Sequence, residues 1–199
     1  MMDLDKKIAI KENLIAQVGS KEAERIWILA KENLKKIEER YPDISKGEMM
    51  HAEFIFPSAA IQLAVKEIKG DSEIGYKAIS EHSWARSREK GAKLKKMAKI
   101  PGFKSFFVKL WDPITKKTFG PESDFKNVFY PKKKGEYKMD IVECPYNRYF
   151  GELGTPELTK IFCINDECMY GDIPGLEFTR HTTLGTGGDK CDFHIRVSK

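Results

Sequence analysis

The sequence predicts an α+β fold, in which N-terminal helices are followed by an antiparallel sheet with helices packed on one face. Up to Trp111, apolar residues recur at helical spacing, and lysines and glutamates fill the positions between them. After Asp112 the period changes to the alternation of strands, which come in two pairs with helices between the pairs. A chain of 199 residues is within the size of one domain. We therefore predict a single α+β domain over residues 1–199, mainly helical over 1–111 and containing the sheet over 112–199.

The mainly helical part shows helical segments that are separated by glycine and proline. These segments cover residues 5–18, 20–41, 58–69, 72–99 and 103–111. Ser20 and Ser58 suit N-terminal caps, and Gly70 suits a C-terminal cap. Residues 43–57 show no decisive pattern. The first two helices are expected to form a hairpin, which either packs on the rest of the chain or acts as an arm in a homo-oligomer.

The sheet-containing part shows strand patterns with turn residues between them. The expected strands cover residues 127–130, 137–144, 176–184 and 191–197, and the expected helices cover 145–153 and 156–170. Residues 132–135 suit a turn between the first two strands. The glycine-rich residues 185–190 suit an antiparallel hairpin between the last two.

Composition and charge limit where the protein works and what it binds. No apolar run approaches the roughly 20 residues that cross a bilayer, and the N-terminus lacks the apolar core of a signal peptide. We therefore expect a cytoplasmic protein with no membrane partner. The net charge of +5 comes partly from a basic run over residues 86–99, but no nucleic-acid recognition motif accompanies it. We interpret this run as a solvated helix face, and expect no nucleic-acid partner; binding through this run is the weakest alternative.

The cysteines all lie in the last third of the chain. A cytoplasmic setting argues against disulfides, and no Cys-x-x-Cys pair marks a structural zinc site. Cys144 comes just before a helix at Pro145, a position that typically lowers the pKa of a thiol. Cys163 and Asp166 are three residues apart and share a helical face, which suits either a thiol with an acid–base partner or two ligands of a metal.

Strand alternation sorts the side chains of the last hairpin. Cys191 shares a face with Phe193, whereas Asp192 belongs to the opposite face. Arg180 and Thr182 fall in line with apolar neighbours. A buried arginine needs a carboxylate partner or a ligand, because an unpaired buried charge costs several kcal/mol. Asp166, Asp192 and a substrate carboxylate are the candidates, and an Arg180 that extends out to solvent is the alternative.

Several short segments in this region form a more specific pattern. They are Cys144-Pro145-Tyr146, Tyr149-Phe150, Glu152-Leu153-Gly154, Pro156-Glu157-Leu158-Thr159, Phe162-Cys163 with Asp166, Phe178-Thr179-Arg180, Thr183-Leu184, Gly187-Gly188 and Cys191-Asp192-Phe193. Over most of residues 142–193 this combination resembles the L-2-amino-thiazoline-4-carboxylic acid hydrolase family, and Cys168 does not belong to it. The resemblance implies a hydrolase acting on a carbon–nitrogen bond, which opens a cyclic amidine in a small carboxylate-bearing substrate and gives a carbamoyl-cysteine.

The resemblance also suggests roles for individual residues. The implied catalytic residues are a thiol among Cys144, Cys163 and Cys191 as nucleophile, and Asp166 or Asp192 moving protons. The implied substrate-binding residues are Arg180, which would hold the carboxylate by a two-pronged contact, with Thr182, Thr183, Gly187 and Gly188 around it.

No cofactor is assumed, and two alternatives use the same cysteines differently. In the first, three cysteines and an aspartate hold a zinc ion that activates water. In the second, the protein is a non-catalytic sensor domain that binds a small molecule, a metal, haem or an iron–sulfur cluster.

Overall fold

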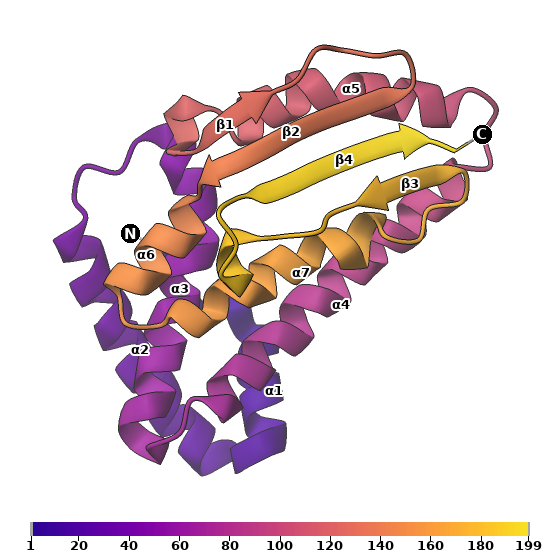
Figure 1. Ribbon diagram of the computed structural model, residues 1–199. Helices are drawn as coiled ribbons and strands as arrows, with labels where there is room; N and C mark the ends of the chain where they lie inside the picture. The colour runs from indigo at the N-terminus through magenta and orange to yellow at the C-terminus, as the bar shows by residue number, and fades with distance from the viewer. Residues whose placement is uncertain (1, 199) are drawn as a thin grey trace.

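The computed structural model describes residues 2–198, which form helices and one four-stranded sheet (Figure 1). The helices are α1 (Ile8–Val18), α2 (Ser20–Arg40), α3 (Lys46–Lys69), α4 (Glu73–Met97), α5 (Phe103–Thr118), α6 (Pro145–Glu152) and α7 (Thr159–Tyr170). The strands are β1 (Lys126–Phe129), β2 (Glu136–Glu143), β3 (Leu176–Thr179) and β4 (Cys191–Val197). The predicted α+β class is confirmed. Among residues 2–198, no helix combines the length and apolar character needed to cross a membrane.

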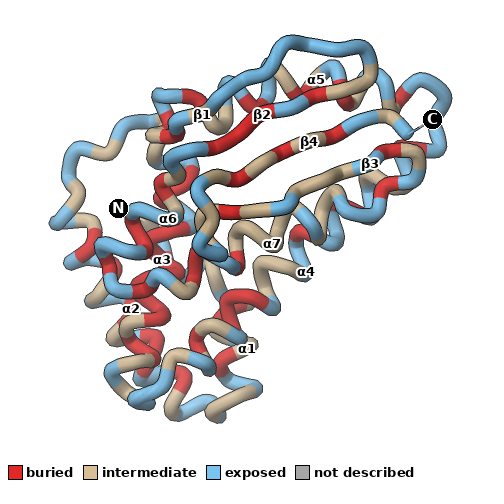
Figure 2. Tube along the Cα trace, in the orientation of Figure 1, coloured by how far each residue is buried: buried red, intermediate tan, exposed pale blue. Residues whose placement is uncertain are grey.

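The N-terminal helices pack on the rest of their own chain. The helix α2 lies along α3 and α1 lies against α4, so the apolar faces of the first hairpin are buried around α3. Figure 2 shows buried residues concentrated in α3 and along the two central strands. A second apolar cluster lies between α5 and the sheet, and Tyr146 contacts both clusters. The single domain and the homo-oligomer stay predictions.

Helix α3 begins earlier than the sequence pattern indicated. The predicted cap at Ser58 is wrong, because Ser58 is buried in the interior of a continuous helix that passes through Pro57. The helix starts at Lys46, where Ser45 and Glu48 form a reciprocal capping box. Proline inside a helix removes one backbone hydrogen bond. Extensive burial of α3 on both sides of Pro57 offsets this loss.

Two other helix boundaries also differ from the expectation. Ser20 is the first residue of α2 rather than its cap, and Gly19 takes the cap position with φ of 80°. Helix α5 continues to Thr118 through Pro113, well beyond the expected end at Trp111. The added turns bury Thr115, which bonds to the hydroxyl of Tyr137 on β2.

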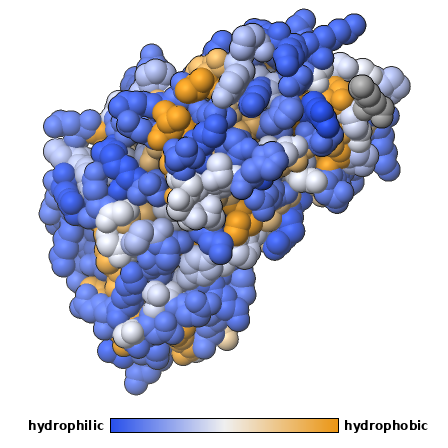
Figure 3. All heavy atoms as spheres, viewed as in Figure 1, coloured by the Kyte–Doolittle hydropathy of each residue, from blue (hydrophilic) through white to orange (hydrophobic). Residues whose placement is uncertain are grey.

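The sheet has the order β1-β2-β4-β3, and all neighbouring strands are antiparallel. In the central pair, Met139 lies opposite Phe193 and Ile141 lies opposite Cys191. These side chains belong to the inner face, which packs on α5. The opposite face carries Asp140 and Asp192 across from each other, and Figure 3 shows a largely hydrophilic surface there.

Strand β3 ends at Thr179, several residues before the predicted end at Leu184. Asp192 accepts the backbone N–H groups of His181 at 2.9 Å and of Thr182 at 2.8 Å. These side-chain contacts replace strand-ladder hydrogen bonds, so the chain leaves the sheet at Arg180. Arg180 and Thr182 are therefore not strand residues, and the predicted extension of the strand to Leu184 was wrong. The prediction that a buried Arg180 pairs with a carboxylate is confirmed, because its guanidinium contacts Asp166.

Candidate active site

A cavity of about 170 Å³ lies between helix α7, the start of α6 and the inner face of the sheet. We call it the thiol cavity. It is lined by Phe119, Phe125, Met139, Ile141, Cys144, Tyr146, Thr159, Phe162, Cys163, Asn165, Asp166, Arg180, Cys191 and Phe193. Three of the four cysteines thus meet one carboxylate and one guanidinium in a space whose other walls are largely apolar. Five of the predicted site residues line it, namely Cys144, Cys163, Asp166, Arg180 and Cys191.

Cys163 is the thiol whose surroundings favour the thiolate. Its pKa is lowered, first because Cys191 donates a hydrogen bond to it, and burial opposes this effect. The hydroxyl of Thr183, the guanidinium of Arg180 and the backbone N–H of Gly185 act in the same direction as Cys191. Cys191 instead keeps its proton. Its pKa is raised, because the proton is held in the hydrogen bond between the two sulfurs.

Gly185 approaches Cys163 so closely that a side chain at this position does not fit. A Cβ atom at Gly185 would lie 2.8 Å from the Cys163 Sγ and 2.8 Å from the Thr159 Cγ2. The absence of a side chain brings the backbone N–H within reach of the sulfur. Sequence reasoning missed this glycine, although it opens the glycine-rich connection in which Gly187 and Gly188 were selected.

The amide groups of Gly187 and Gly188 shape the turn instead of facing the thiol cavity. The N–H of Gly187 bonds to the Leu184 carbonyl at 3.2 Å, and the N–H of Gly188 bonds to the Thr183 carbonyl at 2.9 Å. Gly188 also packs against Thr182, where a Cβ atom would lie 1.8 Å from the hydroxyl oxygen. Gly188 therefore helps to hold Thr183 in place beside Cys163, and Gly187 closes the turn at Leu184.

Arg180 is buried and its terminal nitrogens already have partners. Its side chain is 3% exposed, with Nη1 2.9 Å from Asp166 Oδ2 and Nη2 2.9 Å from Glu167 Oε1. Nη2 also donates to the backbone carbonyl of Cys163. Of the three guanidinium nitrogens, Nε has no partner among residues 2–198. A two-pronged contact with a substrate carboxylate therefore requires Arg180 to release Asp166 or Glu167.

Asp166 has a carboxyl group whose pKa is raised to about 6. Burial is the main cause, and the neighbouring Arg180 opposes it. The side chain nevertheless keeps 34% of its surface accessible, because it faces the open space of the cavity while protein surrounds it at greater distance. Asp166 therefore titrates near neutral pH in a place that a small molecule can enter.

Cys144 does not have the lowered pKa that its place before α6 suggested. Its pKa is raised to about 12 by burial, which outweighs the hydrogen bonds from the N–H groups of Asn147 and Tyr146. The expectation of a lowered pKa for Cys144 was thus wrong, and its catalytic role stays a prediction. Cys168 does not line the cavity, because its backbone lies against Gly91 where α7 crosses α4.

Asp192 and Thr182 lie outside the thiol cavity. Asp192 belongs to the outer face of β4, where it contacts His181 Nδ1 at 2.7 Å as well as two backbone N–H groups. Burial raises its pKa, but these hydrogen bonds outweigh burial and the net pKa is lowered. Asp192 is an ionised anchor for residues 181–182, and its catalytic role stays a prediction.

Tyr146 belongs to the family pattern without an expected role of its own, and the structure places it at the wall of the cavity. The hydroxyl group of Tyr146 lies 3.2 Å from His51 Nδ1, and His51 Nε2 lies 2.8 Å from the Thr118 carbonyl. The pKa of His51 is lowered by burial, so the neutral ring accepts from Tyr146 and donates to Thr118. This chain of contacts fixes the Tyr146 ring beside the thiols.

The side chains do not fit the zinc alternative. Among residues 2–198, no group of three or more His, Cys, Asp or Glu side chains is arranged to hold a metal ion. The three thiols of the cavity therefore do not meet as metal ligands with a carboxylate.

One comparison with known proteins identifies a family that matches most of the chain. Residues 47–195 match the family model described as L-2-amino-thiazoline-4-carboxylic acid hydrolase. The matched region runs from α3 into β4, and includes every residue that lines the thiol cavity. No curated protein and no solved structure matches the chain.

Proposed function

Because the chain belongs to the L-2-amino-thiazoline-4-carboxylic acid hydrolase family, we propose that it opens the ring of a small cyclic amidine by covalent catalysis from Cys163. The family is named for a hydrolase, and the substrate class proposed here is a five-membered thiazoline that carries a carboxylate. The thiol cavity is the proposed reaction site. Its apolar walls suit a compact ring, and its polar lining groups include Cys163 and Asp166 on α7 and Arg180.

The reaction begins with a proton transfer between two groups on α7. The pKa of the Cys163 thiol is lowered and that of the Asp166 carboxyl group is raised to about 6, so the two acidities approach each other. Proton transfer between groups of similar pKa costs little. Cys163 gives its proton to Asp166, and the resulting thiolate attacks the amidine carbon.

The ring then opens and water regenerates the enzyme. The bond from the amidine carbon to the ring nitrogen breaks, and the nitrogen leaves with the proton from Asp166. Water adds to the same carbon, Asp166 takes its proton, and the bond from carbon to Cys163 breaks. The net change is the addition of one water molecule, which leaves a carbamoyl group on the sulfur of the substrate.

The observation that carries this proposal is the set of donors around Cys163. Cys191, Thr183, Arg180 and Gly185 stabilise negative charge on this sulfur, and no comparable set surrounds Cys144 or Cys168. A thiolate is the reactive form of cysteine in nucleophilic catalysis.

The test is turnover of L-2-amino-thiazoline-4-carboxylate by the purified protein and its cysteine variants. We expect Cys163→Ser to lower kcat by about 10⁴-fold or more, as removal of a nucleophile does in other enzymes. Cys168→Ser, on the same helix but outside the cavity, is the matched control and should keep full activity. Mass spectrometry should detect a covalent adduct on Cys163.

Two results would overturn parts of the proposal. Full turnover by Cys163→Ser would show that Cys163 is not the nucleophile. A product with a free thiol, detected with a thiol reagent, would mean that the ring sulfur leaves instead of the ring nitrogen.

A further inference from the structure

A second cavity adjoins the thiol cavity on the side of helices α1, α3 and α4. It has about 160 Å³ and shares Tyr146, Phe162 and Asn165 with the thiol cavity as lining residues. We call it the basic pocket, because Lys7, Arg86 and Lys90 also line it. None of these three cations has a part in the proposed reaction.

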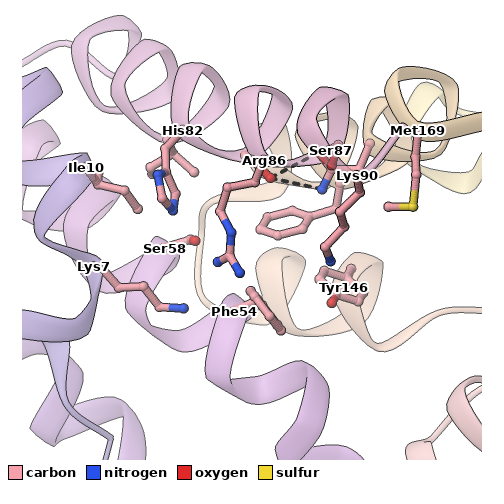
Figure 4. Close-up of a pocket in the computed structure, with 14 residues that line it drawn as sticks. Lys7, Ile10, Phe54, Ser58, His82, Arg86, Ser87, Lys90, Tyr146 and Met169 are labelled. Atoms are coloured by element: carbon pink, nitrogen blue, oxygen red, sulfur yellow. Dashed lines mark hydrogen bonds between the residues drawn. The ribbon is translucent and has the colours of Figure 1, made fainter. Parts of the chain in front are cut away.

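The three cations point into the same space and have no acidic partner there. Figure 4 shows Arg86 and Lys90 extending from one face of α4, with Lys7 approaching from the N-terminal end of the chain. Among residues 2–198, no carboxylate oxygen lies within 4.0 Å of their charged nitrogens. The Lys7 Nζ instead stands 4.5 Å from the centre of the Phe54 ring.

Some basic residues of α4 do have acidic partners and lie outside the basic pocket. Lys93 and Lys95, one turn further along the helix, form ion pairs with Glu89 and Asp172. The basic run that the sequence showed therefore contains residues outside the pocket, which fit the interpretation of a solvated helix face, and Arg86 and Lys90, which line the pocket.

Like charges in the basic pocket disfavour one another. The pKa of Lys7 is lowered, first by burial and then by the charge of Arg86, while Glu53 acts in the opposite sense. The pKa of His82 is lowered by burial and then by Arg86 and Lys7. An anion between these groups would relieve the repulsion.

The remaining walls of the basic pocket suit an organic ligand rather than a bare inorganic ion. Apolar side chains cover much of the pocket surface, namely Ile10, Phe54, Ile79, Phe162 and Met169. Hydroxyl groups of Ser58 and Ser87, both buried, lie between them. Asn165 is fixed by hydrogen bonds of 3.1 Å and 2.9 Å with Ser83.

We propose that the basic pocket binds the carboxylate of a small organic anion, with Arg86 and Lys90 as its main partners and Phe54 and Phe162 against its apolar body. Arginine matches the two oxygens of a carboxylate with two parallel N–H groups. The carboxylate has two sources: the substrate of the thiol cavity, which rests on the proposed function, or a separate ligand. Binding itself does not depend on the reaction.

The experiment titrates the full chain with benzoate, with neutral benzamide and with inorganic phosphate, by calorimetry. We expect benzoate to bind more tightly than the other two, and its affinity to fall at high salt. The double variant Arg86→Gln/Lys90→Gln should bind benzoate at least about tenfold more weakly. The matched control Lys93→Gln/Lys96→Gln removes the same charge from the same helix outside the pocket, and should stay within about twofold of the wild type.

Kinetics with the thiazoline carboxylate then distinguish the two sources. A raised KM with unchanged kcat in the Arg86→Gln/Lys90→Gln variant assigns the carboxylate to the substrate. An unchanged KM with weakened benzoate binding assigns it to a separate ligand. The Cys163→Ser variant should bind benzoate like the wild type, so failure of the proposed hydrolysis does not affect this test.

Three results would overturn the proposal. They are no benzoate binding by the wild-type protein, equal weakening in the control variant, and binding of phosphate in preference to benzoate. Thermal melting of each variant shows whether it is folded.

Discussion

The thiol cavity and the basic pocket share a wall of three side chains, but the cation of the first is paired with carboxylates and, over residues 2–198, the cations of the second are not. In the thiol cavity the Arg180 guanidinium is 3% exposed and contacts both Asp166 and Glu167. In the basic pocket Arg86 and Lys90 are exposed at the rim and have no acidic partner among the described residues. In the thiol cavity the paired cation shifts the pKa values of neighbouring groups, whereas in the basic pocket the positive charge has no acidic partner from the described part of the chain.

Burial explains why the two cavities differ. A deeply buried charge without a partner costs several kcal/mol, so Arg180 must be paired in the folded protein. That pairing places a cation near Cys163 and Asp166 and contributes to both of their pKa values. Charges at a solvated rim need no partner, because water solvates them until a ligand arrives. Chemistry and recognition are therefore expected to respond to different mutations.

The largest effect that separates the two cavities is expected from Asp166→Asn. Loss of this proton carrier should lower kcat by about 10²–10⁴-fold, and should leave benzoate binding unchanged. The raised pKa means that Asp166 is ionised only above about pH 6, and the reaction starts from the ionised form. The wild-type kcat/KM should therefore fall as pH decreases through about 6.

A pH–rate profile of kcat/KM checks this prediction. The acid limb near pH 6 should be present in the wild type and absent from Asp166→Asn. A variant that keeps the same limb would show that another group titrates there. Simultaneous loss of benzoate binding would show that the two cavities act as one site.

A smaller effect is expected from Gly185→Ala. The added Cβ would stand 2.8 Å from the Cys163 Sγ, so the sulfur or the backbone must move. A displacement of about 1 Å in a reacting group costs roughly 10²-fold in rate. The kcat from steady-state kinetics and the rate of alkylation of Cys163 should both decrease.

Gly151→Ala on α6 is the matched control for this change. Nothing lies within 4 Å of a Cβ atom at Gly151, so this variant should behave like the wild type. Full activity in Gly185→Ala would mean that catalysis does not depend on the close approach of residue 185 to the Cys163 thiol.

The smallest effect on catalysis is expected from Asp192→Ala, because Asp192 lies outside both cavities. The kcat should stay within about threefold of the wild type, since the proposed chemistry takes one proton carrier and Asp166 supplies it. The free energy of unfolding should fall by about 1–3 kcal/mol, because two backbone N–H groups lose their acceptor.

The stability difference should itself depend on pH. Asp192 has a lowered pKa, so its contribution is present above the ordinary value of 3.8 and is lost as pH falls through the lowered pKa. Chemical denaturation at neutral and acid pH measures this difference. A loss of activity comparable to that of Asp166→Asn would restore Asp192 as the catalytic acid.

Local patterns in the sequence were sufficient for the fold class and for most elements. The change from helical to alternating apolar spacing near Asp112 predicted the sheet, and β2, β4, α6 and α7 lie within about a residue or a turn of their expected places. The family pattern over residues 142–193 also located the thiols, Asp166 and Arg180. These features depend on spacing along the chain, which the sequence records directly.

Only the tertiary structure decided which of these residues act together. The pKa of Cys144 depends on how deeply the folded chain buries it, and burial outweighed the helix terminus. The positions of Asp192 and Gly185 depend on where the chain leaves β3, and Asp192 itself determines that point. Arg86 and Lys90 border a pocket as well as solvent, because α1 and α3 pack beside α4. The pKa and the charge of a side chain depend on its burial and on partners from distant segments, and the spacing of residues along the chain predicts neither.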